Sequence, residues 1–263
     1  MSLTGKTLAN SYKDILQMDN SNNGVDTTTR NIKDGEGTSS CISISDDTIL
    51  VQPQNDDTTT TLRVRATGGG VVLDVDTTNQ LVVASGNNVN TQYAYFGIDY
   101  TDASGYADDT HQAISFSASG NVANPLFPPA FGTGTDPATT FTTAEGNGTR
   151  ASDLVPVMWV VPDDISIDSV TSIEGADTAT GDTTRMHLFS YTFTSGSTSA
   201  LTSGTLLAHN NDVTNAGSEQ AYLSSWTVDS AAVTAGKVIL AFFKSDSINS
   251  DYSVNIICKY HLT

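Results

Sequence analysis

Apolar and polar side chains alternate through most of the stretch Tyr252-Ser253-Val254-Asn255-Ile256-Ile257-Cys258-Lys259-Tyr260. A period of two places the apolar set on one face of an extended chain, as in a half-buried β-strand. Similar strand candidates lie upstream, at residues 93–98, 113–116, 154–161, 166–170, 186–193, 221–228 and 237–243. We therefore predict an all-β protein in which residues 91–263 form a jelly-roll-like antiparallel β-sandwich head.

Shorter strand candidates separated by turns fill residues 31–90. Residues 62–65, 71–75 and 81–83 each carry an apolar set, and Gly68-Gly69-Gly70 marks a turn between the first two. Strands this short form one thin layer whose apolar face has no second layer to pack against. We predict a short trimeric β-shaft in which three chains wind around a common axis, and a small single-chain sandwich is the alternative.

Residues 1–30 combine weak helical potential with polar turn residues. Tyr12, Ile15 and Leu16 lie on one side of a short helix, which residues 19–24 would end. Because so short a helix is marginal alone, we interpret residues 1–30 as an attachment arm that becomes ordered on a partner, with a frayed terminus as the alternative. The candidate attachment residues are Tyr12, Lys13, Ile15 and Leu16.

The charge balance excludes two classes of function. Eleven Lys and Arg residues face 29 Asp and Glu residues, so the formal net charge is −18. Nucleic acids and anionic membrane surfaces are bound through clustered basic side chains, and no such cluster is present. A hydrophobic share of 38% nevertheless suffices for a folded core. The sequence shows neither a signal peptide nor an apolar run of membrane-spanning length, so we expect a soluble, unprocessed product.

Cysteines and histidines show no metal-binding or redox spacing. Cys41 and Cys258 lack a Cys-x-x-Cys neighbour, and we expect buried free thiols, with a disulfide between them as the alternative. His187 lies mid-strand, where a structural or interface role is expected. His261 is close to the C-terminus, and a metal site shared by symmetry mates is a minor alternative there. We predict no cofactor and no metal.

Catalytic signatures are also missing. No Gly-x-Ser-x-Gly elbow is present, and the paired carboxylates, such as Asp108-Asp109 and Asp163-Asp164, flank predicted turns. Asp starts turns by accepting hydrogen bonds from its own backbone, which explains this placement without chemistry. We therefore predict a protein that is not an enzyme. Residues 119–150 form a long proline-containing loop, expected to be functional or held against a neighbour, and residues 229–236 are expected to form one helical turn.

The N-terminal residues resemble a known class of proteins. Residues 11–20, 24–30 and 33–38 are similar to the opening of trimeric fibre and decoration proteins of tailed-bacteriophage virions. The resemblance is clearest over residues 10–85 and implies an N-terminal segment attached to the particle, a trimeric β-shaft and a C-terminal β-sandwich head. Of the eleven basic residues, Lys6, Lys13, Arg30, Lys33, Arg63 and Arg65 lie in the first quarter of the chain. That end is expected to dock on an acidic capsid or tail surface.

These observations lead to one main functional hypothesis and two alternatives. The main one is a non-enzymatic bacteriophage virion protein: a homotrimeric short fibre or a capsid decoration (cement) protein, made in the host cytoplasm, whose partners are capsid or tail proteins. The first alternative is a tail-fibre adhesin whose head binds a host-surface glycan or protein. The second is a polysaccharide depolymerase, which release of reducing ends from host capsule would reveal. The candidate ligand patch of the adhesin is Tyr93, Tyr95, Tyr100, Tyr106, Asp102 and Asp108.

Overall fold

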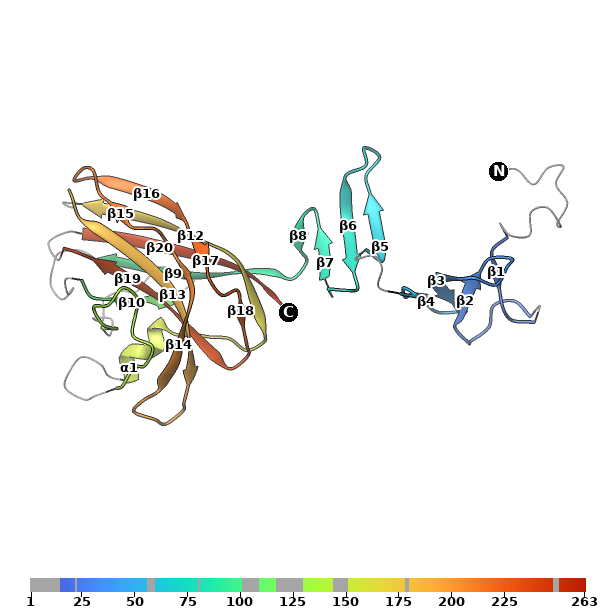
Figure 1. Ribbon diagram of the computed structural model, residues 1–263, viewed down its shortest axis with the longest axis horizontal. Coiled ribbons are helices and arrows are strands. Elements are labelled where there is room, and N and C mark those ends of the chain that lie inside the picture. The colour runs from blue at the N-terminus through green and yellow to red at the C-terminus, as the bar shows by residue number, and fades with distance from the viewer. Residues whose placement is uncertain are drawn as a thin grey trace. The chain divides into compact units, whose positions relative to one another are not determined.

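The computed structural model describes residues 15–21, 23–55, 60–79, 81–100, 109–116, 130–143, 151–177, 180–247 and 251–263. The chain divides into two compact units, Met1–Val89 and Asn90–Thr263. Every strand pair among the described residues is antiparallel, and all the strands except β11 are labelled in Figure 1. The predicted all-β class and antiparallel sandwich are confirmed. The trimeric shaft stays a prediction.

The first unit contains two separate four-stranded meanders. The first consists of β1 (Gln17–Met18), β2 (Arg30–Lys33), β3 (Ser39–Ile44) and β4 (Ile49–Val51). The second consists of β5 (Leu62–Arg65), β6 (Val71–Asp76), β7 (Leu81–Ala84) and β8 (Asn87–Asn88). Part of the predicted arm therefore belongs to the first meander, because β1 pairs with β2 through Gln17↔Lys33 and Met18↔Ile32. Ile15 and Leu16 precede β1 and are not helical.

Aspartates close two turns of these meanders, and the turn at Asp76 was predicted from the sequence. The Asp34 carboxylate accepts hydrogen bonds from the backbone N–H groups of Glu36 and Thr38, at 2.9 Å each. The backbone N–H of Asn79 donates to Asp76 Oδ1 at 2.9 Å between β6 and β7. Gly69 adopts φ +85° in the β5–β6 turn, a conformation that a side chain disfavours. The turns are thus encoded locally.

The second unit is a single twelve-stranded sheet folded into a nearly closed sandwich. One half contains β16 (Gln220–Ser225), β12 (Ile165–Asp177), β20 (Asp251–Leu262) and β9 (Thr91–Tyr100). The other half contains β10 (Gln112–Phe116), β19 (Lys237–Ser245), β13 (Thr183–Phe193), β14 (Leu201–His209) and β17 (Thr227–Val228). Three short strands lie off this path: β11 (Trp159–Val160), β15 (Val213–Thr214) and β18 (Ala232–Val233).

Strands that change partner join the two halves at both edges. Along β10, Gln112, Ala113 and Ile114 pair with β19, whereas Ser115 and Phe116 pair with β9. At the other edge β16 pairs with β12, and the chain passes through Trp226 into β17, which pairs with β14. The Trp226 indole N–H donates to Ser172 Oγ at 2.9 Å. The sheet therefore closes around one interior.

Two hydrophobic clusters lie on opposite faces of the β19–β13 half. In β19, Ile239, Ala241 and Phe243 point into the sandwich interior, and the alternate residues Val238 and Leu240 point to the outer face. That outer face is covered by Phe131, Phe141, Leu154 and Val157. Burial on both faces explains why residues 238–243 are continuously apolar rather than alternating. The described part of the long loop, residues 130–143, is thus packed against its own sheet.

Two local predictions are wrong. Residues 154–161 were expected to form one strand, but the chain forms α1 (Ala151–Leu154) and a 3-10 turn, Val155–Val157, before β11. Pro156 cannot donate to a strand ladder, which accounts for the break. Residues 229–236 contain the short strand β18 rather than a helical turn, because Ala232 and Val233 pair with β12. Among the described residues, no helix has the length and apolar character to cross a membrane.

Gly204 is required where the loop meets β14. A Cβ at this position would lie 2.7 Å from Tyr191 Cε1 and 2.8 Å from Thr139 Cα. We expect Gly204→Ala to lower the free energy of unfolding by about 1–3 kcal/mol through overpacking. Gly175→Ala is the matched control, since its Cβ would meet nothing closer than 4.0 Å. Denaturant unfolding measures both, and equal stability losses would contradict the packing argument.

Candidate functional site

The predicted attachment residues are only partly described. Tyr12 and Lys13 lie outside the described residues. Ile15 is half-buried, and Leu16 is 71% exposed directly before β1. The exposed Leu16 is compatible with a contact to another chain, but its surroundings identify none.

The second meander is amphipathic. Its pairing register aligns Leu62 with Val75 and Val82 in one row, and Val64 with Leu73 and Ala84 in the next. These six side chains form one apolar surface on β5, β6 and β7, called here the β5–β8 face, and Asn87 of β8 lies at its edge beside Ala84. Leu62, Val64 and Val82 are 41–45% exposed. On the opposite side of the meander, Arg63 forms an ion pair with Asp74.

The first meander repeats this arrangement. Ile42 pairs with Val51 and Ile44 with Ile49, so four apolar side chains share one surface, and Ile49 is 76% exposed. Ser43 is the only buried residue among the described residues of the first unit. Neither meander therefore has a hydrophobic core of its own within the described residues, although each presents apolar side chains to solvent.

In the second unit, two residues of the predicted ligand patch are on the open face of the sandwich. Tyr93 and Tyr95 lie on β9 and are 53% and 38% exposed. Tyr100 ends β9, and nothing is described of its side chain. Tyr106, Asp102 and Asp108 lie outside the described residues. The two described tyrosines are not core residues of a single chain.

An apolar stripe continues from these tyrosines across the outer face of the β16-β12-β20-β9 half. Its members are Tyr93, Tyr95, Ile257, Ile173 and Leu223. Tyr95 pairs with Ile257 across β9 and β20, and Ile173 pairs with Leu223 across β12 and β16. Ile173 and Leu223 are 52% and 73% exposed. The three aliphatic members were not predicted from the sequence, although Ile257 occupies a polar position in the 252–260 alternation, which was the available signal.

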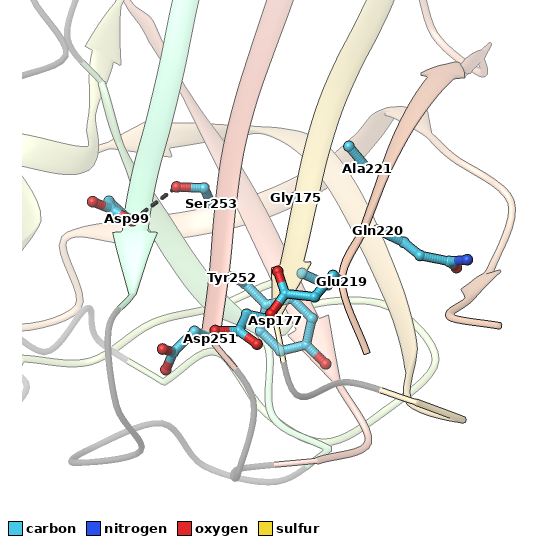
Figure 2. Close-up of a pocket in the computed structure, with 10 residues that line it drawn as sticks. Asp99, Gly175, Asp177, Glu219, Gln220, Ala221, Asp251, Tyr252 and Ser253 are labelled. Atoms are coloured by element: carbon cyan, nitrogen blue, oxygen red, sulfur yellow. Dashed lines mark hydrogen bonds between the residues drawn. The ribbon is translucent and has the colours of Figure 1, made fainter. Parts of the chain in front are cut away.

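An acidic hollow borders the same face at the far ends of its strands. Asp99, Asp177, Glu219 and Asp251 line it, and its volume is about 520 Å³. Figure 2 shows the Asp177 and Glu219 carboxyl groups close together, with Asp99 apart and accepting a 2.8 Å hydrogen bond from Ser253 Oγ. The hydrogen bond with Asp177 raises the pKa of Glu219. Nothing in the hollow identifies a ligand.

A carboxyl group is also buried between the two halves of the sandwich. Glu174 on β12 is 1% exposed, and Thr184 Oγ1 on β13 donates to its Oε1 at 2.6 Å. Its second oxygen, Oε2, has no hydrogen-bond partner. Desolvation by burial raises the pKa of Glu174 from 4.5 to about 7. The carboxyl group is therefore neutral in the folded chain below neutral pH.

Glu174→Gln is expected to stabilise the chain at alkaline pH. The unfolded chain releases this proton near pH 4.5 and the folded chain only near pH 7. The resulting stabilisation of the folded chain is complete below pH 4.5 and is lost as the pH rises through 7. This loss lowers the free energy of unfolding by about 3 kcal/mol. The glutamine side chain does not titrate, so it avoids the loss, and its oxygen still accepts the hydrogen bond from Thr184. Unfolding free energies at pH 5 and pH 9 measure the effect. An unchanged difference between these two values would contradict it.

Two buried histidines lie on the outer face of the β19–β13 half. The rings of His111 and His187 contact each other edge to face, with centroids 4.9 Å apart, and both residues are fully buried. Neither ring nitrogen of His187 has a hydrogen-bond partner, although Asp136 Oδ1 lies 3.4 Å from Nε2. Burial, together with the nearby His111 and Arg185, lowers the pKa of His187 to about 3. The structural role expected for His187 agrees with this burial.

Neither cysteine is paired, and no metal centre is formed by the described residues. Cys41 and Cys258 are free thiols, but Cys41 is exposed, so the prediction that both are buried is wrong. Burial raises the pKa of the Cys258 thiol to about 12. His261 Nδ1 lies 2.8 Å from Asp168 Oδ1. In the described part of the chain, no three His, Cys, Asp or Glu side chains are placed to hold one metal ion.

Comparisons with known proteins add little to this description. No protein-family model matches the chain, and no curated protein matches its sequence. Among solved structures, it is similar to an aminopeptidase from the marine sediment archaeon Thaumarchaeota archaeon, with 7% identity and a TM-score of 0.33. The match covers 73% of this chain and 40% of the aminopeptidase chain. So distant a similarity carries no argument about function.

Proposed function

We propose that the chain is a non-enzymatic structural protein of a tailed-bacteriophage virion. In this proposal it is a homotrimeric short fibre or capsid decoration protein, anchored through its N-terminal region to capsid or tail proteins. The supporting observation is that the first unit presents two apolar sheet faces and has no buried hydrophobic residue among its described residues. Exposed apolar sheet faces such as these are normally covered by another chain in the functional assembly.

Association of identical chains covers both faces at once. Two thin meanders lie in tandem along the chain, and each has one apolar side. Rotational symmetry brings the same faces of several chains together, so the interior of the assembly replaces the missing core. Three copies are proposed because the N-terminal residues resemble trimeric virion proteins. The acidic charge of −18 keeps many copies on one particle soluble.

The mass of the purified full chain in solution tests the association. Light scattering is expected to give three times the chain mass of 27.6 kDa. A monodisperse monomer that retains a β-sheet circular dichroism spectrum would overturn the trimer. A reconstruction of the particle would then locate residues 1–30 and count copies, which separates a head decoration protein from a tail fibre.

Binding of a host surface by the second unit is a second candidate function. The exposure of Tyr93 and Tyr95 favours it, because exposed aromatic rings beside polar side chains are typical of interaction sites. Cell binding by the full chain, compared with that of the Tyr93→Ala and Tyr95→Ala variants, tests this function. Binding that both variants retain would remove these tyrosines from the receptor site.

A further inference from the structure

We propose that neighbouring copies of the same chain bury the apolar stripe, so that the second unit also contributes to the homotrimer interface. The inference rests on the proposed homotrimer and extends it to a named surface. The stripe runs diagonally over four adjacent strands, from Tyr93 on β9 to Leu223 on β16. Adjacent strands lie about 4.8 Å apart, so the five side chains form one continuous patch on the order of a few hundred Å².

The stripe is uncovered in the single chain, unlike the outer face of the other half. There, Phe131, Phe141, Leu154 and Val157 cover β19 and β13. No described residue provides an equivalent layer over Ile173, which is 52% exposed in mid-strand. The same sandwich therefore has one outer face sealed by its own chain and one left open. An open apolar face in the middle of long strands is where another molecule packs.

Charge favours a second copy of this chain as the occupant. The stripe crosses three rows of paired residues on this face of the sheet. The other residues of these rows are Gly97, Ser169, Thr171, Ser225, Asn255 and Lys259. Lys259 is the one charged side chain among them and none is a carboxylate, although the chain contains 29 Asp and Glu residues. Interface cores are depleted in charge, and two chains of net charge −18 approach with least repulsion where carboxylates are missing. Asp99 lies in the next row, opposite Ser253, and Asp177 and Asp251 pair with each other one row further on.

Chain connectivity joins the first unit to the start of the stripe through only a few residues. Val89, the last residue of the first unit, is 62% exposed, and Tyr93 follows four residues later. Four extended residues span at most about 14 Å. If the β5–β8 faces of three chains meet, the three β9 strands begin within a short distance of one another. Once the shaft contacts have formed, the stripes of the three chains are held near one another at a high effective concentration. Their contact then costs little additional translational and rotational entropy.

Cysteine labelling of the full chain tests whether the stripe is covered. In a Cys41→Ser background, Ile173→Cys reports on the stripe and Val160→Cys is the matched control. Both replace an exposed β-branched residue of a strand, and Val160 is 61% exposed on β11, away from the stripe. Cys258 is fully buried and stays unlabelled. We expect maleimide to modify Ile173→Cys at least tenfold more slowly than Val160→Cys in the trimer.

The outcomes separate this inference from the proposed function. Equal labelling rates in a sample with the mass of a trimer would overturn burial of the stripe and leave the homotrimer standing. That result would make the stripe available to a host-surface partner. A sample with the mass of a monomer would overturn the homotrimer and this inference together. Leu223→Cys is the second reporter if Ile173→Cys does not fold, and the same comparison with Val160→Cys applies to it.

Discussion

Val82→Lys is expected to be monomeric at micromolar concentrations at which the unmodified chain is a trimer. Val82 lies in the middle of the β5–β8 face, beside Val75 and 41% exposed in the single chain. Trimerisation would bury three lysines, one from each chain, with no carboxylate on that face. An unpaired buried charge costs several kcal/mol, so three of them raise the dissociation constant by many orders of magnitude.

Val83→Lys provides the control, because it changes the next residue of the same strand on the opposite side. Val83 pairs with Asp74, so a lysine there gains an acidic neighbour and leaves the apolar face intact. Light scattering is expected to show a trimer for Val83→Lys and a monomer for Val82→Lys, with the same β-sheet circular dichroism spectrum. Two trimers would show that the β5–β8 face is not the interface. Two monomers would show that the meander is sensitive to lysine on either side.

His187→Phe is expected to make the chain resistant to acid. The unfolded chain binds a proton on this histidine below about pH 6.5, whereas in the folded chain the pKa of His187 is about 3. Because the folded pKa is depressed, stability is full above pH 6.5 and falls as the pH decreases towards 3. The complete loss is about 5 kcal/mol, of which about 3 kcal/mol has occurred at pH 4.5. Phenylalanine keeps the packing against His111 and removes the titration.

Unfolding free energies at pH 7 and pH 4.5 measure this effect. The difference between them is expected to be about 3 kcal/mol smaller in His187→Phe than in the unmodified chain. His209→Asn is the control, because His209 pairs with His187 across β13 and β14 but is partly exposed and bonded to Asp229. If His209→Asn gave the same acid resistance as His187→Phe, burial would not be the cause.

Local patterns were sufficient to predict many of the elements. The alternation in residues 252–260 corresponds to β20 and the apolar residues of 71–75 correspond to β6, and Asp76 lies in the turn predicted after that strand. Period-two patterning and turn chemistry depend on near neighbours, so they are readable from sequence. β14 was missed because small and polar residues weaken its pattern. Its Gly204 is explained only by contacts with Tyr191 and Thr139, which lie far away in sequence.

Candidate surfaces were harder to predict than strands. Tyr93 and Tyr95 were proposed as ligand residues from their spacing, and the structure shows both exposed. Their aliphatic neighbours Ile173 and Leu223 come from strands far along the chain, and the antiparallel register aligns them in one row. A shift of one residue in that register would turn one of the two side chains into the interior. No local pattern reports such a register, so the stripe was not foreseen.

By itself, the sequence determined that this chain is an all-β protein with thin N-terminal sheets, a larger C-terminal sandwich and a strongly acidic surface. These properties follow from composition and from interactions between near neighbours. Only the tertiary structure decided that residues 130–143 cover one outer face of the sandwich, that the other outer face carries an open apolar stripe, and that Glu174 and His187 are buried. Each of these depends on which distant strands pair and in which register, and local alternation does not specify that choice.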